Sequence, residues 1–452
     1  MAKPVVALVG RPNVGKSTFF NRLSGERLAI VDDVPGTTRD RLFTSTIWNG
    51  VEFYVIDTGG LDPTTGGKEP LSIGSAEYIQ QIRRQVQVAI EDADAILFLG
   101  DAQAGVTPAD QEVAEILRRA GGKSSGSTTA KIFLVVNKAD NKNLREQALQ
   151  FYELGLGDPY PISAMHGTNT GDLLDDLVAA FPVQEEDEDD DSPKIAIVGK
   201  PNVGKSSLLN RLVGKERAIV SPIAGTTRDA IDTPLEYEGV PITLIDTAGI
   251  RRRGRVDAGV EKYSVIRSMR AIERCDVALL LIDAEIGITA QDAHIAGYIL
   301  DAWKSTVVLV NKWDAIEKDS FTMNEYTEKI RNDLNFMDYV PLLFISALSG
   351  QRVDQVLPLA LRVQEERLAQ ISTSQINRIL HAAQDAHPFS RNGRMLRIYY
   401  TTQVRNNPPT FLLHVNDPKI VHFTYLRYLE NRIRDEYNFV GTPIRLVMKA
   451  RR

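Results

Sequence analysis

The stretch Gly199-Lys200-Pro201-Asn202-Val203-Gly204-Lys205-Ser206 decides the fold, and Gly10-Arg11-Pro12-Asn13-Val14-Gly15-Lys16-Ser17 precedes it by 189 residues. Both fit the phosphate-loop pattern G-x-x-x-x-G-K-[ST]. Each follows a short apolar run, at 5–9 or 195–198, and each opens an amphipathic segment, at 18–23 or 207–212. In such a strand–loop–helix setting, backbone N–H groups approach the phosphates, the lysine reaches the outer phosphates, and the serine can ligate Mg²⁺. Two matches in the same setting predict two nucleoside triphosphate sites.

The repeat continues beyond the phosphate loops at the same offset. Gly36-Thr37-Thr38-Arg39-Asp40 recurs as Gly225-Thr226-Thr227-Arg228-Asp229, and Asp57 recurs as Asp246. A period of domain length indicates a duplicated domain and not a solenoid. Further on the first copy is longer, and the Gly- and Ser-rich residues 121–128 have the composition of an inserted surface loop.

Apolar strand candidates alternate with helical stretches in both copies, which predicts two α/β domains with doubly wound, mostly parallel sheets. The expected strands are 5–9, 51–56, 95–99, 132–136 and 160–162, and then 195–198, 240–245, 277–282, 307–310 and 342–345. Ligands bind beyond the carboxyl ends of the strands in such folds, and the motifs lie there.

A linker and a tail complete the organisation. Residues 185–191 are seven consecutive Asp or Glu side chains, which repel one another and stay solvated, so we expect a linker; metal binding is the alternative. The tail is expected to form helix 374–386, strands 394–402 and 410–415, helix 421–437 and strand 442–448, a small α+β domain. The predicted divisions are 1–183, 184–193, 194–370 and 371–452.

The composition of the 452-residue chain, 43% hydrophobic and 25% charged, is that of a soluble globular protein. No apolar run approaches the roughly 18 residues of a membrane helix, and the first strand follows the N-terminus too closely for a signal peptide. The only cysteine, Cys275, cannot form an intrachain disulfide. We therefore expect a cytoplasmic protein that has no membrane partner and is monomeric when free.

Charge is distributed unevenly along the chain. Residues 371–452 hold 13 Lys or Arg against 5 Asp or Glu, a net charge of +8. Since the whole chain has a net charge of −6, residues 1–370 have a net charge of −14. This asymmetry suggests a basic module that contacts an acidic polymer. Neutralisation of the acidic domains by the tail is the alternative.

Two N-K-x-D stretches, each directly after an expected strand, indicate the base. An ionised aspartate only accepts hydrogen bonds, and guanine offers two adjacent donors, whereas adenine would face it with a lone pair. The motif therefore selects guanine, while the lysine stem can lie along the base and the asparagine can tie the loop to the phosphate loop. Backbone N–H groups after the last strands can meet the guanine oxygen. These residues are Asn137, Lys138, Ala139, Asp140, Ser163 and Ala164, and Asn311, Lys312, Trp313, Asp314, Ser346 and Ala347.

Two D-x-x-G stretches at strand ends predict γ-phosphate switches: Asp57-Thr58-Gly59-Gly60 and Asp246-Thr247-Ala248-Gly249. The aspartate is expected to hold Mg²⁺ through water, and the last glycine offers its N–H to the γ-phosphate. One threonine of each preceding pair, expected to be Thr38 and Thr227, completes the Mg²⁺ shell only with triphosphate bound. The expected metal ligands are Ser17, Thr38, Asp57, Ser206, Thr227 and Asp246.

These five motifs, in this order, resemble those of translation-factor-related GTPases. Two such domains in tandem before a small basic α+β domain resemble the Der (EngA) family of bacterial ribosome-assembly GTPases over essentially the whole chain. The resemblance implies GTP hydrolysis in late maturation of the large (50S) ribosomal subunit. It also implies that the tail is a KH-like domain that packs between the GTPase domains and contacts ribosomal RNA. The G-x-x-G loop of KH domains is absent, and Arg391-Asn392-Gly393-Arg394 is the nearest loop.

The position after each D-x-x-G holds Leu61 or Ile250, where many GTPases have a glutamine that orients the attacking water. Catalysis then depends on positioning, Mg²⁺ and a further positive charge. The family resemblance implies K⁺, with Asn13 and Asn202 as ligands; loop stabilisation by these asparagines is the alternative. The expected catalytic residues are Lys16, Thr38, Lys205, Thr227, Asn13 and Asn202.

Two other functions fit parts of the pattern. A tRNA-modifying GTPase shares the Leu/Ile substitution and the phosphate-loop asparagine, but that family predicts a cysteine near the C-terminus, and residues 448–452 contain none. An RNA-binding scaffold with purely structural GTP sites is the other alternative. GTP turnover after separate Lys16→Ala and Lys205→Ala substitutions discriminates it from an enzyme.

Overall fold

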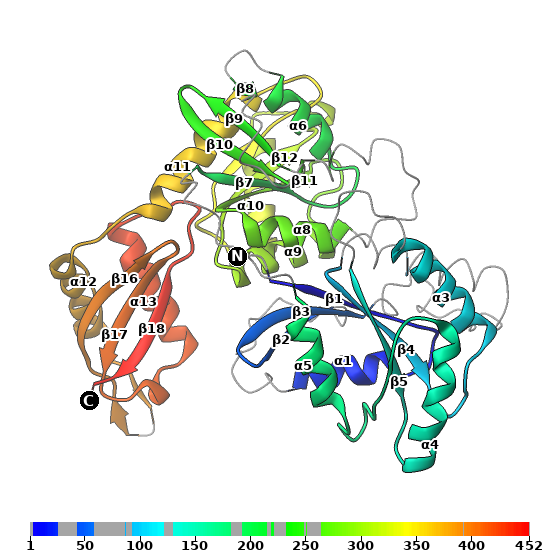
Figure 1. The fold of residues 1–452 in the computed structure, drawn as a ribbon. Coiled ribbons are helices and arrows are strands. Elements are labelled where there is room, and N and C mark those ends of the chain that lie inside the picture. Colours follow the sequence, from blue (N-terminus) through cyan, green and yellow to red (C-terminus); the bar gives the residue numbers. More distant parts are fainter. Residues whose placement is uncertain are drawn as a thin grey trace. The chain divides into compact units, whose positions relative to one another are not determined.

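The computed structural model describes residues 3–25, 43–57, 86, 93–121, 130–181, 192–214, 218–220, 232–247, 250, 264–391 and 393–451. The chain divides into two compact units, Met1–Asp187 and Glu188–Arg452. Each unit contains a mostly parallel sheet with helices on its faces, and the second also contains a smaller α+β module (Figure 1). The predicted α/β class is confirmed. Among the described helices, none has the length and apolarity needed to span a bilayer.

The first unit is built on a six-stranded sheet of order β2-β3-β1-β4-β5-β6, in which only β2 runs antiparallel to its neighbour. The strands are β1 (Val5–Val9), β2 (Phe43–Trp48), β3 (Val51–Asp57), β4 (Ala95–Asp101), β5 (Lys131–Asn137) and β6 (Pro159–Pro161). The helical elements are α1 (Lys16–Gly25), α3 (Pro108–Gly121), α4 (Lys142–Gln147), the 3₁₀ helix η3 (Ala148–Leu154) and α5 (Thr170–Ala179).

The central strand β4 is buried along its whole length because helical elements cover both faces of the sheet. Its alternate side chains enter different cores. Ile96 and Phe98 lie in a cluster with side chains of α3 and η3, whereas Leu97 and Leu99 lie in one with α1 and α5. This two-sided burial explains why the strand is apolar and not alternating in sequence.

The second unit repeats this architecture with a seven-stranded sheet of order β13-β12-β11-β7-β10-β9-β8, where β9 is antiparallel to both neighbours. The strands are β7 (Lys194–Val198), β8 (Ala218–Val220), β9 (Thr233–Tyr237), β10 (Val240–Ile245), β11 (Val277–Asp283), β12 (Ser305–Asn311) and β13 (Leu342–Phe344). The helical elements are α6 (Lys205–Val213), α8 (Ser264–Arg274), α9 (Ala290–Asp301), η6 (Trp313–Ala315), α10 (Thr322–Asp333), η7 (Val353–Gln355) and α11 (Val356–Leu368). The strands β2, β8 and β9 were not among the expected ones.

The tail has the expected α-β-β-α-β order with one added hairpin. A three-stranded sheet of order β16-β17-β18 packs its core against α12 and α13, and β17 and β18 run parallel. In the added hairpin Ser390 pairs with Met395 and Arg391 pairs with Arg394. Paired strands therefore flank the stretch 391–394, which comes nearest to a KH loop in sequence. The elements are α12 (Thr373–Ala386), β14 (Ser390–Arg391), β15 (Arg394–Met395), β16 (Ile398–Asn406), β17 (Pro409–Val415), η8 (Pro418–Ile420), α13 (Phe423–Glu436) and β18 (Arg445–Ala450).

Buried polar contacts join the tail to the second sheet. The N–H of Thr306, in β12, donates to the carbonyl of Gly441 at 2.7 Å. Arg367 is 2% exposed, and its guanidinium donates to Asn407 Oδ1 at 2.6 Å and to the carbonyl of Trp303 at 2.8 Å. Because a buried arginine with unsatisfied donors is strongly disfavoured, these contacts fix the tail on the amino end of β12, opposite its guanine motif.

Candidate guanine nucleotide sites

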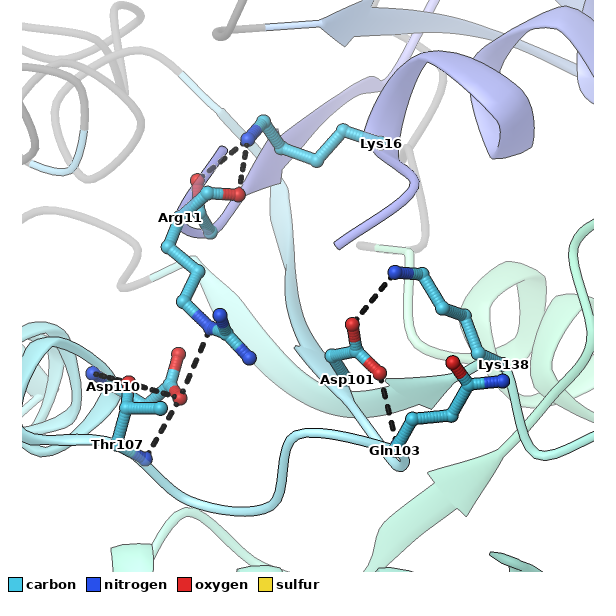
Figure 2. Close-up of polar contacts among 8 residues, drawn as sticks. Arg11, Lys16, Asp101, Gln103, Thr107, Asp110 and Lys138 are labelled. Atoms are coloured by element: carbon cyan, nitrogen blue, oxygen red, sulfur yellow. Dashed lines mark hydrogen bonds and ion pairs between the residues drawn. The ribbon is translucent and has the colours of Figure 1, made fainter. Parts of the chain in front are cut away.

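Each phosphate loop connects the carboxyl end of a central strand, β1 or β7, to the first helix, α1 or α6. In the first loop, Nζ of Lys16 donates to the carbonyl oxygens of Gly10 and Arg11 at 2.6 and 2.8 Å (Figure 2). Lys205 makes the corresponding two bonds in the second loop, at 2.7 and 2.6 Å. Each ammonium group is thus held on the loop, from which the motif lysine is expected to reach phosphate oxygens.

The asparagine of each N-K-x-D motif ties its loop to the phosphate loop. Nδ2 of Asn137 donates to the carbonyl of Val14 at 2.8 Å, and Asn311 makes the same bond in the second copy at 2.7 Å. The adjacent glycines, Gly15 and Gly204, have φ of 95° and 101°, and a Cβ on either would lie 2.2 Å from the asparagine nitrogen. The loop therefore needs glycine both for its backbone conformation and for this close approach.

The lysine of each N-K-x-D motif is anchored by an aspartate at the end of the preceding parallel strand. Nζ of Lys138 lies 2.6 Å from Oδ2 of Asp101, toward which it points in Figure 2, and Lys312 lies 2.6 Å from Asp283. Oε2 of Glu285 also lies near Nζ of Lys312, at 3.8 Å. Both lysines have left-handed backbones, with φ of 62° and 61°. The pairs hold the lysine stems at the sheet edge where the base is predicted.

The aspartates predicted to read the base, Asp140 and Asp314, are exposed. Asp140 accepts a hydrogen bond from Oγ of Ser163 at 2.6 Å. The N–H of Ala164 donates to Oδ1 of Asn137 at 2.9 Å, and Ala347 does the same in the second copy at 2.8 Å. A guanine oxygen must therefore share or replace the asparagine oxygen as acceptor. The role of these N–H groups in guanine recognition stays a prediction.

Two predicted Mg²⁺ ligands meet in the first copy. Oγ of Ser17 donates to Oδ2 of Asp57 at 2.7 Å, and Asp57 is 2% exposed. In the second copy Oγ of Ser206 donates instead to the carbonyl of Ile250 at 2.9 Å, and Asp246 has a left-handed backbone with φ of 54°. The two copies thus differ at this point although their sequences match.

A buried ion pair lies beneath each phosphate loop. Nε of Arg11 lies 3.4 Å from Oδ2 of Asp110, which is fully buried in the first turn of α3 and also accepts from Thr107 (Figure 2). Lys200 and Asp292 form the second pair, at 3.3 Å, in the first turn of α9. Burial raises the pKa of the Asp110 carboxyl, partly offset by the Thr107 hydrogen bond and by Arg11. These pairs connect the second residue of each phosphate loop to a helix start.

The ammonium of Lys16 is held in an environment that disfavours its charge. Burial lowers its pKa from 10.5 to about 8; Asp57 opposes this shift and Arg11 adds to it. A bound phosphate supplies negative charge beside the ammonium and so raises the pKa again. A phosphate at this position would therefore favour the charged form of Lys16.

The other predicted positions differ in exposure, and some of them lie outside the described residues. The variable positions Ala139 and Trp313 are buried, whereas Asn13 and Asn202 are exposed with left-handed φ of 67° and 62°. Several predicted residues lie outside the described ranges: Thr38, Thr58, Gly59, Gly60, Leu61, Thr227, Ala248 and Gly249, together with residues 122–128 of the inserted loop and residues 185–191 of the acidic linker.

The residues that support the motifs were not among those predicted from the sequence. Asp101 and Asp110 belong to no named motif, and their partners are far along the chain. Arg22, in α1, donates to the backbone of the first Ser-Ala loop. A residue-by-residue comparison of the two copies would have found them, because each recurs with the same contacts: Asp283, Asp292 and Arg211.

Comparison with known proteins agrees with this geometry. A family model described as "50S ribosome-binding GTPase" matches residues 5–138 and 194–312, and one described as "KH-domain-like of EngA bacterial GTPase enzymes, C-terminal" matches residues 370–449. The chain is 53% identical over 455 residues to the GTPase Der of Chloroflexus aggregans and 50% identical over 454 residues to that of Listeria monocytogenes. All of this chain is covered in both cases, as are 99% and 100% of these relatives.

Proposed function

Because the chain belongs to the GTPase Der family, we propose that both of its P-loop domains bind and hydrolyse GTP and that it acts in late maturation of the large ribosomal subunit. The observation that carries the proposal is the duplicated frame around each site. In both copies a lysine bonds two loop carbonyls, an asparagine ties the base motif to the phosphate loop, and the motif lysine pairs with a strand-end aspartate.

The residues of the first site have separable tasks in this proposal. Lys16 bridges the phosphate loop to the outer phosphates, and Asp140 accepts the two guanine donors. Asn137 keeps the base and phosphate motifs in register, so that the γ-phosphate is positioned when the base is read. Lys205, Asp314 and Asn311 do the same in the second site.

The donor set at the first site suits Mg²⁺. Ser17 and Asp57 place a hydroxyl and a carboxylate oxygen 2.7 Å apart, and both are hard oxygen ligands. Within the described residues no group of three or more His, Cys, Asp or Glu could hold a metal ion. We assign the remaining coordination to Thr38 when triphosphate is bound, to phosphate oxygens and to water, since Mg²⁺ commonly keeps several waters. When bound, the ion neutralises charge on the phosphates.

We assign a K⁺ requirement to Asn13 and Asn202. Both are exposed and hold the same left-handed conformation in the two loops. Ile250 is 8% exposed and has no group that could orient water, so an added cation is the simplest source of transition-state stabilisation. GTP turnover is expected to be faster in K⁺ than in Na⁺, and Asn13→Ala together with Asn202→Ala is expected to abolish the difference. Equal turnover of the parent protein at matched ionic strength would count against the assignment.

The tail is the proposed contact with ribosomal RNA. It carries a net charge of +8, and β16 exposes Tyr399 and Tyr400 at 40% and 47%. The Arg451 guanidinium lies 4.9 Å from the centre of the Tyr399 ring. Cations interspersed with exposed aromatic rings suit a nucleic-acid surface. The proposed setting is the cytoplasm, with the chain monomeric when free.

Two measurements test the function. Lys16→Ala and Lys205→Ala should each remove the GTP turnover of one site. If the double variant turns over GTP at the rate of the parent, neither site is catalytic, and an RNA-binding scaffold with structural GTP sites is the remaining alternative. Sedimentation with ribosomal subunits should show binding to the large subunit that depends on whether GDP or a non-hydrolysable GTP analogue is present. Failure to co-sediment in either state would refute the ribosomal role while leaving the enzyme intact.

A further inference from the structure

We propose that Arg22 and Arg211 are specificity-determining positioning residues, each holding a Ser-Ala loop in the shape that reads guanine. The inference rests on the proposed guanine recognition by these loops. It goes beyond that function because a side chain of the helix after each phosphate loop then sets the backbone shape of the loop that is proposed to read the base.

The contact in the first copy joins α1 to residues more than 140 positions away. Nε of Arg22 donates to the carbonyl of Ala164, and Nη2 donates to the carbonyl of Met165, each at 2.5 Å. The planar guanidinium fork offers donors in a fixed geometry and so fixes the orientation of both successive carbonyls. A lysine ammonium, which lacks this fork, could not fix both in the same way.

The second copy contains the same construction. Nε of Arg211, in α6, donates to the carbonyl of Ala347 at 3.3 Å, and Nη2 donates to that of Leu348 at 2.5 Å. The loop side chains themselves differ, since Met165 in one copy corresponds to Leu348 in the other. The arrangement therefore follows the backbone of the loop and the arginine, and not the packing of a particular side chain.

A glycine with a left-handed backbone lies beside the guanidinium in both copies. Gly167 and Gly350 have φ of 75° and 87°, and a Cβ on Gly167 would lie 2.6 Å from Nη1 of Arg22. On Gly350 it would lie at the ordinary contact distance of 3.4 Å from Nη1 of Arg211. The turn that closes each loop thus brings its backbone close to the arginine in both copies, and in the first copy it leaves no room for a side chain.

The arginine bonds the residue that carries the predicted guanine donor, at the carbonyl of the next peptide unit. The carbonyl of Ala164 is held by Arg22, and its N–H is held by Oδ1 of Asn137. Asn137 in turn bonds the phosphate loop at Val14. Because α1 begins at Lys16, one connected frame holds both the phosphate-binding lysine and the base-reading N–H.

The residue after each Ser-Ala pair argues against a purely structural role for the second arginine bond. The Ser-Ala residues are buried, but Met165 and Leu348 are 74% and 77% exposed, so neither inserts its large apolar side chain into the core. Fixing the backbone of such an exposed residue adds little apolar burial. What fixation provides is a preorganised N–H for a ligand, which lowers the ordering cost of binding.

The test uses the full-length chain with Lys205→Ala, so that only the first site is read. GDP, IDP, ADP and inorganic pyrophosphate are titrated against this parent and against Arg22→Gln, Arg22→Lys and Arg119→Gln. Arg119 is an exposed arginine of α3 that pairs with Glu115, and it serves as the matched control. IDP keeps the guanine oxygen and loses only the amine that Asp140 reads. Arg211→Gln in a Lys16→Ala chain repeats the test for the second site.

With Arg22→Gln we expect GDP and IDP affinity to fall about tenfold in parallel, as for the loss of a charge-assisted hydrogen bond. Pyrophosphate affinity should stay within twofold, Arg22→Lys should give a smaller loss of GDP affinity, and Arg119→Gln none. Unchanged GDP affinity and GDP/ADP preference in Arg22→Gln would overturn the inference. An equal loss of pyrophosphate affinity would also overturn it, because it would indicate a general structural role. A parent that binds ADP as tightly as GDP would instead refute the proposed guanine recognition. If Arg22→Gln does not fold, Arg22→Lys decides by the same comparison.

Discussion

The asparagine tether is the contact on which the first site depends most, and Asn137→Ala removes it. The side chain of Asn137 is 3% exposed and bonds two buried backbone groups, the carbonyl of Val14 and the N–H of Ala164. Alanine has neither a donor nor an acceptor in its side chain, so both groups lose their partner. The phosphate loop and the base loop then lose a side chain that bonds directly to both.

The expected loss of GDP affinity follows from the two backbone groups that are left without a partner. Leaving a buried backbone group unsatisfied costs about 1–3 kcal/mol. The vacated space adjoins the site and can admit water, so the lower end applies to each group, a total of about 2 kcal/mol. Because the loops must then be ordered on binding, this loss is expected in the binding free energy, and GDP affinity should fall about 30-fold.

GDP titration of a Lys205→Ala chain measures this loss without interference from the second site. Hydrogen exchange of residues 162–168 is expected to accelerate in Asn137→Ala, because the N–H of Ala164 loses its acceptor. Asn143→Ala, at an exposed position in α4, is the matched control and should leave both measurements unchanged. GDP affinity within twofold of the parent and unchanged exchange in Asn137→Ala would refute the tether.

Three further predictions follow. Since burial lowers the pKa of Lys16 to about 8 and a bound phosphate raises it again, GDP binding to the first site should take up more protons at pH 9 than at pH 6, as calorimetry of a Lys205→Ala chain in buffers of different ionisation enthalpy would show. Above pH 8, GDP affinity should fall as pH rises. Asp110→Asn strands the Arg11 charge and should destabilise the first unit by about 1–3 kcal/mol, with Arg11→Gln restoring part of the loss in chemical denaturation of the double variant. Arg367→Met should destabilise the tail's attachment by about 2–4 kcal/mol and accelerate hydrogen exchange around Asn407, whereas normal exchange there would contradict the anchoring role.

The parallel strands could be predicted from sequence because helices cover both faces of the sheets and make those strands apolar throughout. Strands β2 and β9 escaped because neither is apolar throughout: residues 44–46 of β2 are Thr-Ser-Thr, and Pro234 within β9 argues against a strand by itself. Strand β8 is only three residues long. Such segments become strands through pairing with a neighbour, which a local pattern does not reveal.

The motif residues were predictable because phosphate and guanine chemistry dictates both residue type and spacing. The residues that support the motifs could not be predicted, because arginine and aspartate side chains serve many purposes in proteins. Arg22 and Asp101 act through partners fixed only by the fold, a helix facing a loop and two neighbouring strand ends. The duplication supplies the missing signal, since a support used in one copy recurs in the other.

The account rests on two guanine-specific sites in one chain, which nucleotide stoichiometry tests most directly. Equilibrium dialysis of the full-length protein should give two GDP bound per chain, one after Lys16→Ala, one after Lys205→Ala, and no displacement of GDP by equal concentrations of ATP. A single GDP per unmodified chain, or ATP competing as well as GTP, would contradict it.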